Sequence, residues 1–146
     1  MSPLIAMALL LVGQDDPETE RKSFQVAEGY EVNLFASEKD GIVKPLQIRW
    51  DARGRLWVAC GQSYPQLKPG EVADDTIVIL EDTDGDGRAD KSSVFARGLN
   101  TPMGLELGNG GAYVGAGEEI LHLKDEGGRA GERRVLFKGF FAADSH

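Results

Sequence analysis

The chain of 146 residues carries 16 Lys and Arg residues against 24 Asp and Glu residues, which gives a formal net charge of −8. This acidic balance, without a cluster of basic residues, argues against nucleic acid as a partner, because phosphate backbones are bound through Lys and Arg. A hydrophobic fraction of 41% permits a folded core, and 19 glycines predict many tight turns rather than a helical bundle. The single cysteine, Cys60, excludes an intrachain disulfide, a multi-cysteine zinc site and a covalent haem attachment.

The N-terminus begins with a ten-residue apolar run at positions 3–12, P-L-I-A-M-A-L-L-L-V. This run is too short to span a bilayer, which takes about 20 helical residues. A short apolar run before a polar segment is typical of an export signal, although no Lys or Arg precedes it and no clean A-x-A site follows it. We therefore predict a signal peptide over residues 1–13, an exported protein that is periplasmic or associated with the cell envelope, and no membrane span after signal removal. A buried strand or a wrongly assigned start of the chain is the alternative.

Two segments follow before the first repeat. Residues 14–23, Q-D-D-P-E-T-E-R-K-S, contain no apolar side chain and predict a solvated linker. Tyr30–Ser37 alternates polar and apolar residues, which predicts a lone strand. The remaining fold is expected to occupy residues 24–146.

The middle of the chain is repeated in its later part. Residues 56–59 align with residues 112–115, and residues 76–82 align with residues 119–125. The four apolar runs of each copy are bounded by Gly and Asp, which predicts strands at about 46–51, 55–60, 76–81 and 92–97, and then at about 103–107, 112–116, 119–124 and 133–138.

A repeated four-stranded unit is typical of a β-propeller blade. We therefore predict an all-β fold, a partial β-propeller of about two four-stranded blades plus the lone N-terminal strand. An ordinary β-sandwich is the alternative. Because propellers close with about 4 to 8 blades, the chain is expected to be the first part of a larger ring.

The turn D-T-D-G-D-G-R-A-D at residues 82–90 is the strongest candidate for a ligand site. Its carboxylates occupy loop positions 1, 3, 5 and 9, which are Asp82, Asp84, Asp86 and Asp90. A glycine at position 6 permits a sharp turn, and the carbonyl of Arg88 at position 7 can add an oxygen ligand. This set of hard oxygen ligands predicts a Ca²⁺ site, because four converging carboxylates repel one another without a cation.

The calcium prediction is for a loop that differs from an EF-hand and from the matching turn of the second copy. An EF-hand is excluded because Ser93 stands at position 12 in place of a bidentate Glu, and because the flanking segments are predicted strands. A solvated Asp-Gly hairpin turn without an ion is the alternative. The matching turn of the second copy, residues 125–128, has lost most of its carboxylates and is expected to bind no ion.

Other residues carry weaker signals. Trp50 and Trp57 are expected in the core or between blades, because aromatic bulk usually serves packing. His122 lies between two leucines and is predicted to be a packed or outward-facing strand residue. Tyr64 and Lys68 lie in a long excursion, where a repeat protein often places ligand contacts.

Four segments together resemble a known family: G-Y-E-V-N-L-F-A-S, Q-I-R-W-D-A-R-G-R-L-W-V-A, I-L-E-D-T-D-G-D-G-R-A-D and G-L-N-T-P-M-G-L-E-L-G. They are similar to the N-terminal propeller domain of large exported proteins of planctomycetes and verrucomicrobia that are labelled membrane-bound dehydrogenases. That domain is in turn similar to the six-bladed soluble quinoprotein glucose and sorbosone dehydrogenases. The resemblance covers residues 24–146 and implies a six-bladed ring in the full-length form, of which this chain is a truncated part.

The resemblance implies a dehydrogenase that oxidises a sugar or another small molecule, in which pyrroloquinoline quinone with Ca²⁺ accepts the hydride. His146 stands where the quinoprotein relatives carry the base that takes the sugar hydroxyl proton, and a terminal His without a role is the alternative. The fragment is expected to be inactive alone. A calcium-stabilised propeller that binds a ligand without catalysis is the alternative function.

Overall fold

A computed structural model describes residues 16–65, 67–68 and 70–139 of the chain. The chain divides into two units after Leu34, and each unit is described by itself. The predicted signal peptide at residues 1–13 lies outside the described residues. Within those residues, no helix is both long enough and apolar enough to cross a membrane.

The first unit contains one short helix, α1 (Pro17–Ser23), in the segment expected as a linker. A proline lies in its first turn, where the missing N–H costs nothing. Glu18 and Glu20 lie at the N-terminal end and Arg21 and Lys22 at the C-terminal end, the arrangement that the helix dipole favours. No residue of α1 is buried, so the N-terminal proline and the local charges rather than packing account for this helix.

The strand expected at Tyr30–Ser37 is absent, and this prediction was wrong. A strand must pair its backbone groups with a neighbour, and the two sheets of the described chain are each formed by other segments. The polypeptide instead continues into a 3-10 helix, η1 (Glu38–Asp40). Ser37 and Asp40 form a capping box around it, in which the Ser37 N–H donates to Asp40 Oδ2 at 2.8 Å.

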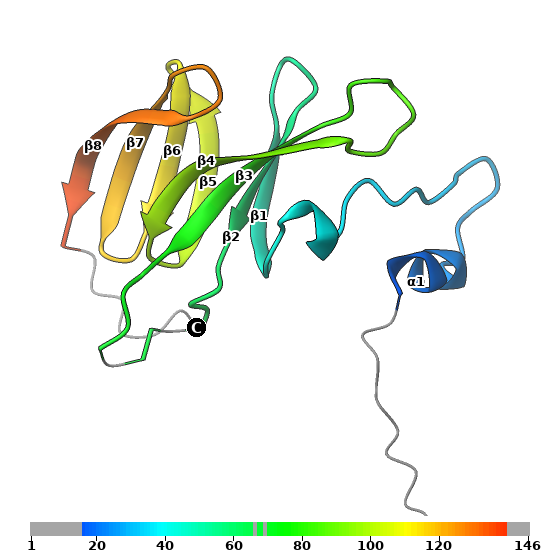
Figure 1. Cartoon of the computed structure of the whole chain (residues 1–146), viewed down its shortest axis with the longest axis horizontal. Helices are drawn as coiled ribbons and strands as arrows, with labels where there is room; N and C mark the ends of the chain where they lie inside the picture. Colours follow the sequence, from blue (N-terminus) through cyan, green and yellow to red (C-terminus); the bar gives the residue numbers. More distant parts are fainter. Residues whose placement is uncertain (1–15, 66, 69, 140–146) are drawn as a thin grey trace, which may run out of the picture. The chain divides into compact units, whose positions relative to one another are not determined.

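The second unit is built from two four-stranded antiparallel sheets (Figure 1). The first sheet contains β1 (Pro45–Trp50), β2 (Leu56–Cys60), β3 (Asp75–Glu81) and β4 (Lys91–Leu99). The second sheet contains β5 (Pro102–Gly108), β6 (Gly111–Ala116), β7 (Glu119–Asp125) and β8 (Ala130–Lys138). Neighbouring strands in the chain are neighbours in each sheet, so each repeat folds as one meander. The all-β class and the eight repeat strands are thus confirmed, with bounds that differ from the predicted ones by a few residues.

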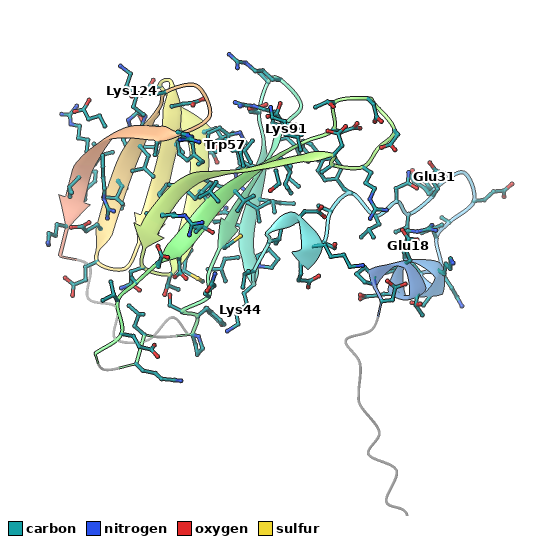
Figure 2. The ribbon with its side chains drawn as sticks, in the orientation of Figure 1. Glu18, Glu31, Lys44, Trp57, Lys91 and Lys124 are labelled. Carbon is teal, nitrogen blue, oxygen red and sulfur yellow. The ribbon has the colours of Figure 1, made fainter. Side chains whose placement is uncertain are left out.

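The two sheets share one hydrophobic core. The first sheet contributes Trp57 and Ala59 from β2 and Ile77 and Ile79 from β3, while the second contributes Ala112, Val114, Leu121 and Leu123. Trp57, which is labelled in Figure 2, is only 2% exposed. Its ring centroid lies 4.5 Å from that of Phe95. Each large apolar side chain removed from water here stabilises the fold by about 1.5–3 kcal/mol.

The other face of the first sheet is covered by residues 35–42, which we call the covering segment. Ile42 belongs to a second core, and Phe35 and Ala36 pack against it. The Phe35 carbonyl accepts the Ala89 N–H at 2.8 Å, and the Asp40 carbonyl accepts the Ser92 hydroxyl at 2.6 Å. Because both faces are covered, every residue of β2 is buried.

The second sheet differs, because only the face toward the first sheet is covered by the described residues. Along β6, buried residues alternate with half-exposed ones. Tyr113 and Gly115 of β6 and Ile120 and His122 of β7 lie on the opposite side, which we call the open face. Phe137 of β8 pairs with Ile120 on this face and is 63% exposed.

Candidate functional site

Residues 82–90, which we call the acidic loop, connect β3 to β4. Hydrogen bonds to the loop's own carboxylates hold it together. The two oxygens of Asp82 accept the N–H groups of Gly85 and Gly87 at 2.7 and 2.9 Å. The Asp86 N–H donates to Asp84 Oδ1 at 3.2 Å. Gly85 and Gly87 have φ values of 79° and 87°, which glycine adopts without strain. The alternation of Asp and Gly therefore produces a compact turn that is stabilised locally.

This turn brings three of the four predicted carboxylates together. Asp82, Asp84 and Asp86 each offer one oxygen, and these three oxygens lie within 4.8 Å of one another. Ligands that lie 2.3–2.6 Å from a shared Ca²⁺ are at most about 5 Å apart, so the spacing fits this ion. A carboxylate that accepts one or two N–H groups retains lone pairs for a cation. The chemistry and spacing of the donors are thus compatible with calcium.

Hydrogen bonding favours the ionised form of Asp82. The bond from the Gly87 N–H has the largest effect on the pKa of Asp82, and the N–H groups of Gly85 and Asp86 act in the same direction. Together they lower this pKa below its ordinary value against a smaller opposing effect of burial. Asp82 is therefore negatively charged at neutral pH, as a metal ligand must be.

Asp90 and Arg88 occupy different places in the loop. The Asp90 carboxylate accepts the Thr83 N–H at 3.0 Å and the Thr83 hydroxyl at 2.8 Å, so it closes the base of the loop and is not part of the group of three. The Arg88 N–H donates to Asp86 Oδ1 at 2.8 Å. The predicted role of the Arg88 carbonyl as a ligand stays a prediction.

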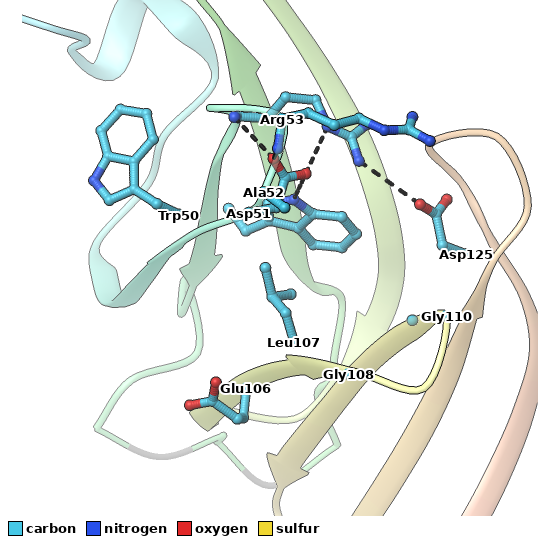
Figure 3. Close-up of a pocket in the computed structure, with 12 residues that line it drawn as sticks. Trp50, Asp51, Ala52, Arg53, Glu106, Leu107, Gly108, Gly110 and Asp125 are labelled. Atoms are coloured by element: carbon cyan, nitrogen blue, oxygen red, sulfur yellow. Dashed lines mark hydrogen bonds and ion pairs between the residues drawn. The ribbon is translucent and has the colours of Figure 1, made fainter.

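An open groove of about 640 Å³ lies where the two sheets meet (Figure 3). The β1–β2 turn with Asp51 and Arg55 forms one wall, and Glu106 with the β5–β6 turn and Asp125 forms the other. Arg55 Nε donates to Asp51 Oδ2 at 2.7 Å, and Arg55 Nη2 lies 3.7 Å from Asp125 Oδ2. Arg55 therefore links the turns of the two sheets electrostatically.

Asp51 is the centre of a hydrogen-bonding network with Arg53, Arg55 and Trp57. Burial alone would raise its pKa, but hydrogen bonds from the Trp57 indole and from Arg55 and Arg53 outweigh burial, so the pKa of Asp51 is lowered. The Trp57 Nε1–H donates to Asp51 Oδ2 at 3.0 Å, which explains how a nearly buried indole is satisfied. The only signal of this network in the sequence is the charged turn D-A-R-G-R after Trp50, which was not among the predicted sites.

The excursion between β2 and β3 is held by a buried carboxylate that the sequence analysis also missed. Asp75 is 1% exposed and accepts the N–H of Ser63 at 2.9 Å, the N–H of Thr101 at 2.7 Å and the Ser63 hydroxyl. Tyr64 and Lys68, the candidate ligand contacts, belong to this excursion. They precede β3 while the acidic loop follows it, so the fold does not bring the two candidate regions together.

The remaining candidates are placed as follows. Trp57 is a core residue, as predicted, whereas Trp50 is 55% exposed beside the groove, so of its two predicted places, in the core or between blades, the core is excluded. Trp50 retains one packing contact, because its ring centroid lies 5.0 Å from that of Phe35. His122 packs against Tyr113 at 4.7 Å, as a strand residue should. His146 lies outside the described residues.

Comparison with known proteins gives one finding. A family model described as a domain of unknown function, DUF7133, matches residues 16–146, so the chain belongs to this family. Searches among curated proteins and among solved structures find no significant match.

Proposed function

We propose that this DUF7133 chain forms part of a β-propeller domain that binds one calcium ion in the acidic loop. The observation that carries the proposal is the convergence of Asp82, Asp84 and Asp86, whose oxygens lie within 4.8 Å of one another. Three negative charges at this spacing repel one another, and a bound divalent cation would offset that repulsion.

The arrangement of the sheets supports the propeller part of the proposal. Each repeat folds as one four-stranded antiparallel meander, and the two meanders stack face to face. The first sheet has two apolar faces, one against the second sheet and one beneath the covering segment; a sheet in a ring of blades needs two such faces, whereas a sheet in a two-layer sandwich needs one.

Calcium in this loop would have a structural role. Asp82, Asp84 and Asp86 would hold the ion, and their N–H partners would keep the carboxylates oriented before it binds. The acidic loop includes Ala89, which is 8% exposed and belongs to the core beneath the covering segment. Ordering the loop would therefore stabilise the packing of the first sheet against this segment.

Isothermal titration calorimetry with CaCl₂ tests the calcium site directly. We expect binding heat for the wild-type chain and none for Asp84→Ala/Asp86→Ala, because two of the three converging carboxylates are removed. Glu126→Ala, in the corresponding turn of the second sheet, is the matched control and should bind like the wild type. Equal heats for the double variant and the control would refute the site.

The dehydrogenase activity stays a prediction from the resemblance. Its expected base, His146, lies outside the described residues, and pyrroloquinoline quinone is expected on the resemblance alone. Because the fragment is expected to be inactive alone, reconstitution of the full-length form with the quinone and Ca²⁺, followed by dye reduction with a panel of aldoses, tests it. Loss of about 10² to 10⁴ in rate for His146→Gln would support a general base. No dye reduction with any sugar would leave the binding module as the function.

A further inference from the structure

We infer that Asn109, in the β5–β6 turn, is a site of spontaneous deamidation, and that the hydroxyl of Tyr113 slows this reaction by holding the Asn109 side chain. Deamidation replaces a neutral amide by a carboxylate and can lengthen the main chain of the turn. The inference goes beyond the proposed function and is independent of both the calcium site and the propeller.

The reaction needs only the turn itself and water. The backbone nitrogen of Gly110 forms a bond to Asn109 Cγ, and the side-chain amide leaves as ammonia with the proton of the Gly110 N–H. Water then opens the resulting cyclic imide at one of its two carbonyls, which gives either Asp or isoaspartate. A glycine after the Asn favours the first step, because it has no Cβ to crowd the attacking nitrogen.

The structure distinguishes Asn109–Gly110 from the other pairs of this kind. The chain contains four Asp–Gly or Asn–Gly pairs, and Asn109–Gly110 is the one with Asn. In the other three pairs the glycine N–H donates to an oxygen of its own turn at 2.7 to 3.1 Å; these glycines are Gly41, Gly85 and Gly87. The Gly110 N–H has no acceptor among the described residues, so no such bond holds its nitrogen back from attack.

The closed turn opposes the attack. Asn109 and Gly110 have φ values of 51° and 72°, the two positive values that a type I′ turn requires. In this left-handed conformation the nitrogen of Gly110 and the side chain of Asn109 point apart, so the two react only when the turn opens. Both residues are exposed, so opening the turn uncovers no core.

Tyr113 holds the closed turn through the side chain that reacts. Asn109 Nδ2 donates to the Tyr113 hydroxyl, which is the one hydrogen bond of this amide to the described residues. Tyr113 is fixed by its own strand, β6, and its ring lies 4.7 Å from that of His122. Removal of the hydroxyl alone should therefore free the amide while the ring keeps its packing.

Deamidation would weaken the link between the two sheets. The Gly110 carbonyl accepts the Asp125 N–H at 2.8 Å, and Asp125 Oδ2 lies 3.7 Å from Arg55 Nη2 (Figure 3). Isoaspartate adds one methylene carbon to the main chain, which a two-residue turn does not accommodate without moving Gly110. Asp125 would then lose a backbone partner and its place beside Arg55.

Peptide mass spectrometry of the whole chain, incubated at neutral pH and sampled over time, tests the site. Asn33 and Asn100 are internal controls, because Leu34 and Thr101 follow them. We expect Asn109 to deamidate about tenfold faster than either, because glycine follows it. Rates at Asn109 that do not exceed those of the two controls, in the wild type and in Tyr113→Phe, would overturn the inference.

Tyr113→Phe tests the role of the hydroxyl. This variant should deamidate at Asn109 several-fold faster than the wild type. Tyr30→Phe is the matched control, because Tyr30 is 76% exposed in the first unit, and it should react like the wild type. Circular dichroism shows whether the sheets are intact in each variant. Equal rates for Tyr113→Phe and Tyr30→Phe would remove Tyr113 from the inference.

Urea unfolding tests the effect on the sheets. Protein converted to isoaspartate at residue 109 should unfold at a lower urea concentration than fresh protein. Asn109→Asp, which introduces the carboxylate without lengthening the main chain, should unfold close to the wild-type midpoint. An unchanged midpoint after conversion to isoaspartate would show that the turn does not support the link between Asp125 and Arg55.

Discussion

The two hairpin turns that begin at Asp82 and Asp125 occupy equivalent places in the two repeats and use the same carboxylate differently. Each Asp accepts an N–H from a glycine later in its own turn, Gly85 for Asp82 and Gly128 for Asp125. Asp82 then lies beside two further carboxylates, whereas Asp125 lies 3.7 Å from the guanidinium of Arg55.

This difference shows how a repeat acquires a new role without changing its fold. The first carboxylate closes the turn in both copies, so it is a structural feature of the hairpin. The surrounding charges differ: Asp84 and Asp86 place two further carboxylates beside Asp82, where we propose that a cation binds, whereas the Arg55 guanidinium lies beside Asp125 in the second copy.

Removal of the arginine should have the largest effect. Arg55→Ala leaves Asp51 without its guanidinium partner and separates the two turns, and breaking such a largely buried pair should lower the free energy of unfolding by about 3 kcal/mol. Arg49→Ala is the matched control, because its pair with Glu106 at 2.9 Å is more exposed and should contribute less than about 1 kcal/mol. Urea unfolding measures both, and equal losses would show that Arg55 is not the link between the turns.

Calcium should have the next largest effect. At a free concentration 100 times the dissociation constant, one site adds about 2.7 kcal/mol to the free energy of unfolding. Thermal unfolding with and without Ca²⁺ should show this gain for the wild type and for Glu126→Ala. It should show none for Asp84→Ala/Asp86→Ala. A calcium response that survives the double variant would place the ion elsewhere.

Removal of the Asp125 carboxylate should lower the free energy of unfolding by about 1 kcal/mol. Asp125→Ala deletes the acceptor of the Gly128 N–H and a partner of Arg55, but the guanidinium keeps its closer bond to Asp51. Calcium binding should be unchanged in this variant, because Asp125 is not part of the acidic loop. Urea unfolding and calorimetry on one preparation check both statements, and a loss as large as that of Arg55→Ala would contradict them.

Acid should destabilise the protein gradually. The pKa of Asp51 is lowered in the folded state, where burial is outweighed by hydrogen bonds from Trp57, Arg55 and Arg53. Its contribution is complete above the unfolded value of about 3.9 and is lost as pH falls through the lower folded value. Stability measured from pH 6 down to pH 2 should therefore fall below about pH 4, and less steeply in Asp51→Asn. Identical slopes would assign the acid sensitivity to other carboxylates.

The repeat accounts for most of the fold that could be predicted. Alternating β-branched residues bounded by Gly and Asp placed all eight strands, because these signals act over a few neighbouring residues. The same locality explains why the strand at Tyr30–Ser37 was predicted wrongly. Its alternation satisfies the local rule for a strand, but among the described residues no strand pairs with this segment.

For the candidate site, too, local spacing predicted the positions of some residues and not of others. The spacing of Asp82, Asp84 and Asp86 predicted their convergence, because short glycine turns bring alternate side chains together. Asp90 satisfied the same spacing but binds Thr83, since hydrogen bonds within the loop compete for its carboxylate.

The sequence by itself determined the strand order, the two meanders and the acidic turn, because each depends on residues that are close along the chain. Only the tertiary structure decided that the covering segment protects one face of the first sheet, that the second sheet keeps an open face, and that Arg55 joins Asp51 to Asp125. These features depend on residues that are distant along the chain and meet only when the two sheets pack, so no local pattern encodes them.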